Sequence, residues 1–325
     1  MALVAVTDHV FPHLEQERTL LAEVGHELRF GSNAASIEEV RGAVADADAV
    51  LNCYAPMPAE VIRGLDHCVV IARYGIGLDT IDLDEATAKG IVVTNVPDYC
   101  IDEVSDHALA LILSLARGIT LLDRRVRSGS WTPSDARPLH RLRGRTVGLV
   151  GFGRIARALA TKLAPLGFRV VTFDPFVPDE AIREAGAEPM TLEELLRAAD
   201  VVSVHAPLTA DNRHLIGPAE LALMKPHAIL VNTSRGPLID LDAVRTALAE
   251  GRLGGAGLDV LEVEPPSADD PLLHRSNVVI TPHAAFYSEE SLQELQRKAV
   301  EQVIEALAGR TPPYAVNADA LAARS

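Results

Sequence analysis

Three polar residues follow three separate apolar segments in the second half of the chain. Arg235 comes after "HAILVNTS", Glu264 after "GAGLDVLEV" and His283 after "NVVITP". Histidine exchanges protons near neutral pH, so His283 could give or take the hydroxyl proton when a carbonyl and an alcohol interconvert. A neighbouring carboxylate, which Glu264 would supply, stabilises imidazolium and raises the pKa of the ring. The guanidinium of Arg235 could grip a carboxylate and polarise an adjacent carbonyl, which suits a 2-oxo or 2-hydroxy acid.

These residues are expected at one edge of one parallel sheet. Six strand candidates follow one another in order: "RTVGLVGFG", "FRVVTFD", "ADVVSVHAPL", "HAILVNTSRG", "GAGLDVLEVEPP" and "NVVITPHAA". In open parallel sheets, ligands bind beyond the carboxyl ends of the strands. Each residue alone also has an ordinary structural role, as a surface ion pair, a loop acid or a strand cap. Their coincidence at one edge favours a catalytic site.

A glycine turn opens this series of strands. Gly151-x-Gly153-x-x-Ala156 follows the first strand candidate and begins a helix, and the next strand ends at Asp174. The first glycine permits a tight turn, the second lets a pyrophosphate approach the backbone, and the small third residue lets the helix pack closely. The helix N-terminus then faces the phosphates. Asp174, 23 residues after Gly151, can bind ribose hydroxyls and would repel a 2′-phosphate, so we expect NAD rather than NADP as cofactor.

The composition is that of a soluble globular protein. A length of 325 residues suits two domains, and the net charge of -15 disfavours nucleic acid or a membrane surface as a partner. Three widely spaced cysteines show no metal-ligand pattern, so we expect reduced thiols and no metal site. The N-terminus "MALVAVTDHVF" lacks the basic flank of a signal peptide. We therefore expect a cytoplasmic protein.

Short β-rich segments alternate with helical patterns along the whole chain. This rhythm predicts an α/β fold of two Rossmann-like or flavodoxin-like domains with parallel sheets and a cleft between them. We expect a discontinuous substrate-binding domain over 1–98 and 287–325, completed by the amphipathic segment "SLQELQRKAVEQVIEALAGR". Residues 99–286 would form the NAD-binding domain. The segment 101–131 reads as one long helix that links the two.

Further substrate contacts come from the ends of other segments. "RYGIGLD" places the backbone N–H groups of Ile76 and Gly77 in a glycine turn, which is either a second cradle for the substrate carboxylate or a plain turn. Tyr54 and Phe286 could line the substrate site or serve in ordinary packing.

These motifs together resemble the D-isomer-specific 2-hydroxyacid dehydrogenases, from about residue 45 to the C-terminus. "RYGIGLDTIDLDEATAKGI", "GFGRIA", "VNTSRGPLID", "LDVLEVEPP" and "TPHAA" occur in the order that the family shows. The resemblance implies hydride transfer between NAD and C2 of a small 2-oxo or 2-hydroxy acid of the D series. It implies Arg235, Glu264 and His283 as catalytic residues, and a homodimer to which the long linking helix contributes.

The resemblance also implies a set of cofactor contacts. Asp259 would lie near the nicotinamide carboxamide, and "HAPLTADN" beside the adenosine half. With the glycine turn, the candidate contacts are Gly151, Gly153, Arg154, Ile155, Asp174, His205, Pro207, Asn212, Thr233, Ser234, Asp259 and Val104.

Within the family, the closer likeness is to the C-terminal-binding protein branch. It is seen in "VPDYCIDEVSDHALALIL", "NRHLI" and "TPHAAFYSEESLQELQRKAVEQVIEALAGRTP". That branch includes corepressors as well as bacterial enzymes, so the alternative function is an NAD(H)-gated interaction protein with little turnover. Retention of all three catalytic residues favours the enzyme, and Phe286 stands where animal corepressors typically carry tryptophan. An inorganic or phosphonate substrate on the same machinery is a third alternative.

Overall fold

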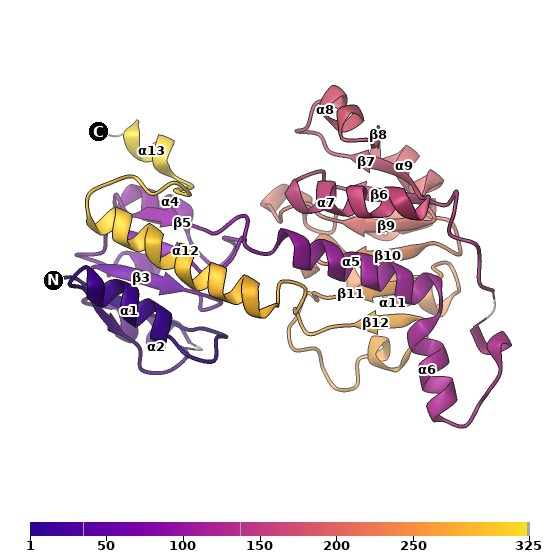
Figure 1. The fold of residues 1–325 in the computed structure, drawn as a ribbon, viewed down its shortest axis with the longest axis horizontal. Helices are drawn as coiled ribbons and strands as arrows, with labels where there is room; N and C mark the ends of the chain where they lie inside the picture. The colour runs from indigo at the N-terminus through magenta and orange to yellow at the C-terminus, as the bar shows by residue number, and fades with distance from the viewer. Residues whose placement is uncertain (35, 137, 324–325) are drawn as a thin grey trace. The chain divides into compact units, whose positions relative to one another are not determined.

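The computed structural model describes residues 1–34, 36–136 and 138–323. They form two compact units (Figure 1): unit 1 comprises Met1–Cys100 with Ser288–Ser325, and unit 2 comprises Ile101–Tyr287. The sequence places the corresponding borders at 98–99 and 286–287, within two residues of these. Each unit has its own parallel sheet.

Unit 1 contains a five-stranded parallel sheet in the order β2-β1-β3-β4-β5. This is the strand order of flavodoxin-like folds, in which the strand order reverses between the first and third strands. The strands are β1 (Leu3–Val6), β2 (Glu27–Arg29), β3 (Ala49–Asn52), β4 (Val70–Arg73) and β5 (Val92–Thr94). The helices are α1 (Glu15–Glu23), α2 (Ile37–Val44), α3 (Ala59–Ile62), α4 (Leu83–Ala88), α12 (Glu289–Leu307) and α13 (Ala318–Ala322).

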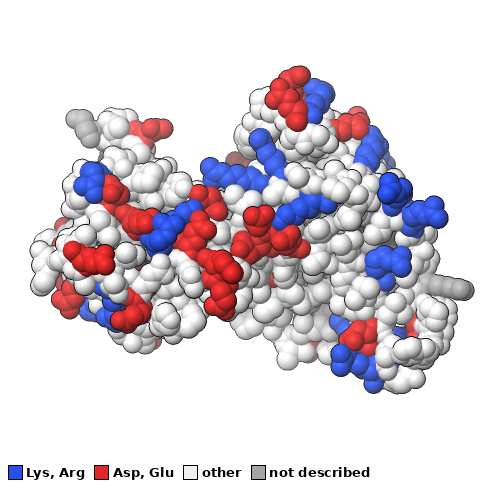
Figure 2. Space-filling view, viewed as in Figure 1, with Lys and Arg blue, Asp and Glu red and all other residues white. Residues whose placement is uncertain are grey.

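Helix α12 brings the C-terminal part of the chain onto the sheet of unit 1. It packs against β3, β4, β5 and α1. Its first turn is capped by Ser288, whose hydroxyl accepts a hydrogen bond from the Ser291 amide. On its exposed face, Arg297 pairs with Glu301 and Lys298 pairs with Glu294. Figure 2 shows the acidic and basic side chains interspersed over this helix.

Unit 2 contains a seven-stranded parallel sheet in the order β12-β11-β10-β9-β6-β7-β8. The order reverses between β6 and β9, as in doubly wound dinucleotide-binding domains. The strands are β6 (Thr146–Val150), β7 (Arg169–Phe173), β8 (Glu188–Pro189), β9 (Val201–Val204), β10 (Ile229–Asn232), β11 (Gly255–Leu258) and β12 (Val278–Ile280). The predicted class, two α/β units with parallel sheets, is confirmed.

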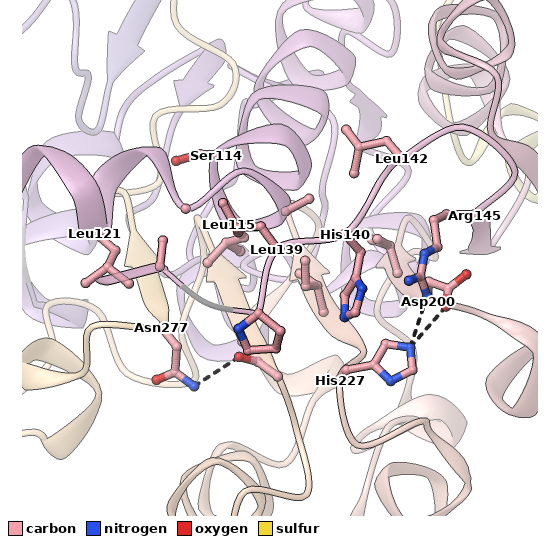
Figure 3. Close-up of a pocket in the computed structure, with 18 of the residues that line it drawn as sticks. Ser114, Leu115, Leu121, Leu139, His140, Leu142, Arg145, Asp200, His227 and Asn277 are labelled. Atoms are coloured by element: carbon pink, nitrogen blue, oxygen red, sulfur yellow. Dashed lines mark hydrogen bonds and ion pairs between the residues drawn. The ribbon is translucent and has the colours of Figure 1, made fainter. Parts of the chain in front are cut away.

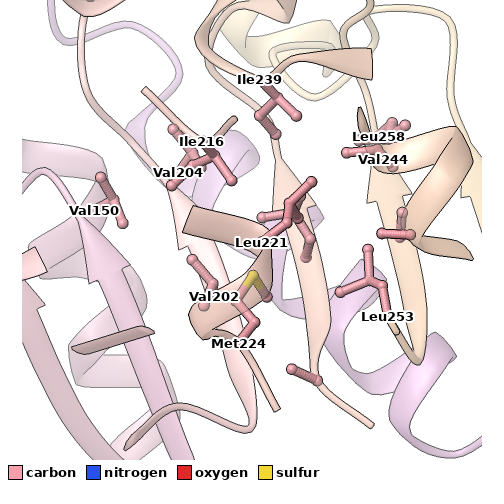
Figure 4. Close-up of a cluster of buried hydrophobic side chains, with 14 of the residues drawn as sticks. Val150, Val202, Val204, Ile216, Leu221, Met224, Ile239, Val244, Leu253 and Leu258 are labelled. Carbon is pink, nitrogen blue, oxygen red and sulfur yellow. The ribbon is translucent and has the colours of Figure 1, made fainter. Parts of the chain in front are cut away.

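The helices of unit 2 are α5 (Ile101–Ala116), α6 (Ile119–Arg127), α7 (Arg154–Leu163), α8 (Asp179–Glu184), α9 (Leu192–Ala198), α10 (Pro218–Leu223) and α11 (Leu241–Ala249). Helices lie on both faces of the sheet, whereas α6 contacts α5 and has no buried side chain. One apolar core lies between the sheet and α9, α10 and α11 (Figure 4), where Val202, Leu221 and Val244 are fully or almost fully buried. A second core joins the other face to α5 and α7 through Ile112, Leu149 and Leu159. Because both faces of the sheet are buried, most of its strands have consecutive apolar residues in place of an alternation of apolar and polar ones.

The prediction of one long helix over 101–131 is wrong. Helix α5 ends at Ala116, and α6 begins at Ile119 after a bend of 60°. Gly118 lies between them with φ 62°, a left-handed conformation that glycine adopts without steric cost. The apolar spacing continues through the bend, which is why the sequence pattern hides it.

Among the described residues, no single helix is long and apolar enough to cross a membrane, although α5 and α6 taken together pass that test of length and composition.

Candidate active site

The three predicted catalytic residues all lie in unit 2, beyond the carboxyl ends of neighbouring strands. Arg235 follows β10, Glu264 follows β11 and His283 follows β12. The ring atom Nδ1 of His283 lies 2.9 Å from Oε2 of Glu264. The structure therefore pairs the imidazole with the carboxylate at the predicted edge of the sheet.

The Glu264 carboxylate is held in its ionised form. Burial by itself would raise its pKa, but hydrogen bonds from His283 and the Leu261 amide outweigh that effect, and the charges of His283 and Arg235 add to them. The net result is that the pKa of Glu264 lies below its ordinary value. An ionised Glu264 on Nδ1 directs the opposite nitrogen, Nε2, to proton exchange with a substrate.

Arg235 is positioned by its own turn. The Asn232 side chain donates a hydrogen bond to the Arg235 carbonyl at 2.8 Å and accepts one from the Ser234 amide at 3.0 Å. Gly236 then packs directly on the segment after β11, because a Cβ at this position would lie 1.9 Å from the Leu261 carbonyl oxygen. Only glycine fits there, and this contact brings the turn after β10 against the segment that leads to Glu264.

His283 has an unusual backbone conformation. Its φ of 52° lies in the left-handed region, which costs free energy for a residue with a side chain. The buried Asp259 holds the loop: its main-chain oxygen accepts from the His283 amide, and its carboxylate accepts from the amides of Ala284 and Ala285. Asp259 thus serves the histidine loop directly, and its predicted contact with the nicotinamide carboxamide stays a prediction.

Phe286 lies beside the catalytic histidine. The centres of the two rings are 6.3 Å apart, and their planes meet at 77°. This edge-to-face arrangement places an apolar side chain next to the group that would exchange the proton. Phe286 is therefore a suitable apolar contact for a substrate that reaches His283.

The glycine turn after β6 has the geometry of a phosphate site. Gly151 has φ 93°, and a Cβ on it would lie 2.7 Å from the Ala206 amide nitrogen, so a larger residue would clash with backbone. Helix α7 begins at Arg154 and Ile155 after the exposed Gly153, which provides no side-chain cap. A helix N-terminus without a side-chain cap is suited to an anion, which its positive dipole end attracts.

Asp174 supports this turn from the end of β7. Its Oδ2 accepts from the Phe152 amide at 2.7 Å, and its Oδ1 accepts from the Phe176 amide at 2.8 Å. Carboxylate oxygens have further lone pairs, so the group can still accept from ribose hydroxyls. A 2′-phosphate bound next to this carboxylate would be repelled by its negative charge.

Two buried polar atoms at this edge of the sheet have no partner among the described residues. They are Nδ1 of His205 and Oγ1 of Thr233, which follow β9 and β10. Burial lowers the pKa of His205 to about 4, so its ring is neutral at pH 7. Buried polar atoms without partners are costly, and a cofactor with hydroxyl and amide groups would relieve that cost. The turn, Asp174 and these atoms therefore fit NAD.

The other predicted cofactor residues have structural contacts of their own. Asn212 donates to the Pro207 carbonyl and shapes the loop after β9. The Ser234 hydroxyl donates to the Val204 carbonyl, and Val104 is buried on α5. Their contacts with NAD stay predictions.

The predicted substrate residues of unit 1 follow β3 and β4. Ile76 and Gly77 form a turn whose amides have no acceptor among the described residues, while Asn95 donates to the Ile76 carbonyl. Tyr54 is 40% exposed, and its amide donates to the buried carboxylate of Asp8. This turn can accept an anion in its backbone N–H groups.

Arg73, which ends β4 and is only 6% exposed, is not among the residues predicted from the sequence. Its Nε is buried without a partner, and no described carboxylate lies within ion-pair distance of its guanidinium. Gly75 has φ 141°, a conformation that residues with a side chain rarely adopt, and a Cβ on it would lie 2.5 Å from Nη1 of Arg73. A buried cation without an anion costs free energy. The signal was present, since an arginine at the end of the apolar "VVIAR" repeats the pattern that identified Arg235.

A cavity of about 250 Å³ lies elsewhere in unit 2, at the amino ends of the strands (Figure 3). Asp200 at its wall accepts hydrogen bonds from Arg145, Lys225 and His227. Burial would raise the pKa of Asp200, but these donors and the Thr146 amide hold it well below its usual range. The strands separate this cavity from His283, so it is distinct from the candidate active site.

Comparisons with known proteins agree with this geometry. The family model described as D-isomer specific 2-hydroxyacid dehydrogenase, NAD binding domain, matches residues 109–285. A glyoxylate reductase of Korarchaeum cryptofilum is 41% identical over 86% of this chain and 86% of its own length. A D-3-phosphoglycerate dehydrogenase of Mycobacterium leprae is 39% identical over 85% of this chain and 52% of its own length. The solved D-lactate dehydrogenase of Aquifex aeolicus, complexed with NAD and lactic acid, is 28% identical with a TM-score of 0.84, covering 94% of this chain and 96% of that one.

Proposed function

Because the chain belongs to the D-isomer specific 2-hydroxyacid dehydrogenase family, we propose that His283, Glu264 and Arg235 carry out the reduction of a small 2-oxo acid. The protein is an NAD-dependent D-2-hydroxyacid dehydrogenase. The observation that most directly supports this catalytic role is the 2.9 Å contact between Nδ1 of His283 and Oε2 of Glu264. The contact lies beyond the carboxyl ends of the strands, in the same sheet whose strand β6 leads into the glycine turn.

The roles of the residues follow from their chemistry. When bound, NADH supplies the hydride that is added to C2 of the oxo acid. Nε2 of His283 gives a proton to the carbonyl oxygen, which becomes the hydroxyl of the product. Glu264 stabilises the protonated ring before that transfer. Arg235 binds the substrate carboxylate and polarises the neighbouring carbonyl.

Unit 1 is proposed as the substrate-binding domain. The Ile76 and Gly77 amides and the buried Arg73 guanidinium are suited to an anionic group of the substrate. Tyr54, with its ring centre 5.3 Å from the Arg73 guanidinium carbon, would line the same region. In unit 2, Phe286 would contact the part of the substrate beside His283.

A panel of small 2-oxo acids with NADH tests this function. We expect oxidation of NADH, followed by its absorbance, with at least one two- to four-carbon 2-oxo acid, and a product of the D form where the acid has three carbons or more. The His283→Ala variant, assayed in parallel, gives the background rate of NADH oxidation.

The same assay separates the alternative functions. Tight NADH binding without oxidation of NADH by any oxo acid would support the second candidate, an interaction protein of the C-terminal-binding protein type, which the motifs of this chain resemble. Oxidation of phosphite or a phosphonate with NAD would support the third.

Replacing Glu264 by Gln should move the alkaline limb of the pH profile for reduction to lower pH. The lowered pKa of Glu264 means that its charge is present at neutral pH and is lost only in acid. A glutamine can accept the same hydrogen bond but has no charge, so the imidazolium loses electrostatic support. Profiles of kcat/KM for the two proteins check this, and an alkaline limb that does not move would contradict the pairing.

We also propose a homodimer in which a second copy covers α6. No side chain of α6 is buried, and large apolar side chains are exposed there: Ile119 is 57% and Val126 46% exposed. Trp131, beyond the end of the helix, is 86% exposed. Residues 117–145 contain eight arginines and two aspartates in a chain of net charge -15, so this segment is attracted to an acidic surface such as a second copy offers.

Light scattering tests the dimer. We expect wild-type protein at twice the mass of one chain, and the double variant Ile119→Glu, Val126→Glu at the mass of one. The exposed residues Val10 and Val24 of unit 1, replaced in the same way, provide the matched control and should leave the mass unchanged. A wild-type protein at the mass of one chain would refute the proposal.

A further inference from the structure

A series of hydrogen bonds connects helix α5 to the loop that carries His283. On α5, Nε2 of His107 lies 2.9 Å from Oγ1 of Thr281. The Thr281 hydroxyl in turn donates to Oδ1 of Asp259 at 2.6 Å. We propose that His107 is a positioning residue for the reduction, because it fixes Thr281 and Asp259, which hold the loop in the conformation that presents His283.

The direction of these bonds follows from the number of protons. A threonine hydroxyl has one hydrogen, and here it is donated to Asp259. The Thr281 oxygen can therefore only accept from His107, so Nε2 of that ring carries a proton. The bonds run in one direction, from the ring to the hydroxyl to the carboxylate. In a protein interior, the hydrogen bonds of such a series polarise and strengthen one another.

The Asp259 carboxylate depends on protein donors because it is only 2% exposed. Its oxygens accept from Thr281, Ala284 and Ala285, and Nε2 of His107 lies 3.6 Å from Oδ1. A buried carboxylate that loses a donor or a nearby imidazole is destabilised. Loss of His107 would therefore weaken the group that holds the two amides after His283.

The loop needs this support because of its backbone. A φ of 52° at His283 is unfavourable for a residue with a side chain, and it persists only where surrounding contacts determine it. The three amides of residues 283 to 285 all donate to Asp259, one to its carbonyl and two to its carboxylate. A shift of Asp259 would thus be passed to His283 and alter the angle at which its ring meets Glu264.

Helix α5 is a suitable anchor for His107. It packs against β10, β11, β12 and α7, with Ala108, Leu111 and Ile112 buried on its inner face. The His107 side chain is 25% exposed, so it adds little to the apolar core. Its contribution is the hydrogen bond to Thr281. Because α5 packs on the sheet, the helix can hold the His107 ring in the position that this bond requires.

Kinetics of matched variants test the proposal. We expect His107→Ala to lower kcat by about 10- to 100-fold, as misplacement of a catalytic group does, while the Kd for NADH is unchanged. His107→Gln should restore most of the rate, because its amide nitrogen can donate from nearly the position of Nε2. His227→Ala is the control, since that ring also bonds a carboxylate, Asp200, but at the other end of the sheet.

A double-mutant cycle tests whether His107 acts through Thr281. Thr281→Val removes the hydroxyl but keeps the shape of the side chain. If the two residues act in one series, His107→Ala combined with Thr281→Val lowers kcat no further than the more damaging single change. Multiplied effects would show that His107 acts independently of Thr281 and would overturn the proposal, as would a kcat for His107→Ala equal to that of wild type.

Hydrogen exchange gives a readout that does not require turnover. In His107→Ala, the amides of residues 283–285 should exchange faster than in wild type, whereas His227→Ala should leave them unchanged. Unchanged exchange in His107→Ala would overturn the structural step of the proposal. The kinetic step rests on the proposed function of His283, and the two failures are distinguishable: if wild-type protein reduces no 2-oxo acid, the function fails while the exchange result still stands.

Discussion

Replacing His283 by Ala should lower kcat for reduction of a 2-oxo acid by about 10²- to 10⁴-fold, the range that positioned acid–base groups contribute. The variant loses the proton donor for the developing alkoxide, and Glu264 loses the ring that it supports at 2.9 Å. NADH should still bind, because the glycine turn and Asp174 are untouched. Steady-state kinetics together with a fluorescence titration of NADH measure both quantities.

The backbone at His283 calls for a second variant. Alanine is strained at a φ of 52°, so part of any loss could come from a displaced loop. Asparagine tolerates the left-handed region better and does not titrate near neutral pH, so His283→Asn should show the same loss of kcat with the loop preserved. His274→Ala, at an exposed position in the same unit, is the control. Wild-type turnover in His283→Asn would remove the histidine from the role of acid.

Replacing Arg235 by Gln should lower kcat/KM by about 10²- to 10³-fold, as the loss of one preorganised donor to developing charge does. The guanidinium is proposed to bind the substrate carboxylate and polarise the carbonyl, so both KM and kcat should suffer. Its loss also removes a positive charge that helps to lower the pKa of Glu264. Measurements at several pH values separate these two effects.

Lysine at position 235 separates charge from geometry. Arg235→Lys keeps the positive charge but loses the planar pair of donors, so we expect most of the loss to remain. Arg252→Gln is the control, because that arginine pairs with Glu250 on the surface of the same unit. If Arg235→Lys had the wild-type kcat/KM, a positive charge alone would be enough to bind the substrate carboxylate. The proposed binding through two guanidinium donors would then be wrong.

The sequence predicts the sheets well where their strands are apolar on both faces. The segments that form β6, β7, β9, β10 and β12 are rich in valine, leucine and isoleucine, whereas β11 is the small and apolar "GAGL". Strands β2 and β8, which have no counterpart among the predicted strand segments, are short and polar and lie at sheet edges. Nothing in their composition distinguishes them from loops.

The candidate site was predictable in its residue types but not in its supports. His283, Glu264 and Arg235 were found because polar residues at strand ends share an edge of the sheet. Their supporting contacts join positions far apart in sequence. The bond from His107 to Thr281 crosses 174 residues, and the fit of Gly236 against Leu261 depends on how two segments pack. Such contacts leave no local pattern.

Transfer of the hydride from NADH to C2 of the substrate can be followed directly with an isotope. Protein is supplied with NADH carrying deuterium at both C4 positions and with the best 2-oxo acid of the panel, and the product is analysed by NMR and for its chirality. We expect deuterium at C2 of the hydroxy acid, in proportion to the NADH consumed, and the D form of the product where C2 is a stereocentre. Product without deuterium at C2, or NADH that binds but transfers no label to any 2-oxo acid, would contradict direct transfer of the hydride.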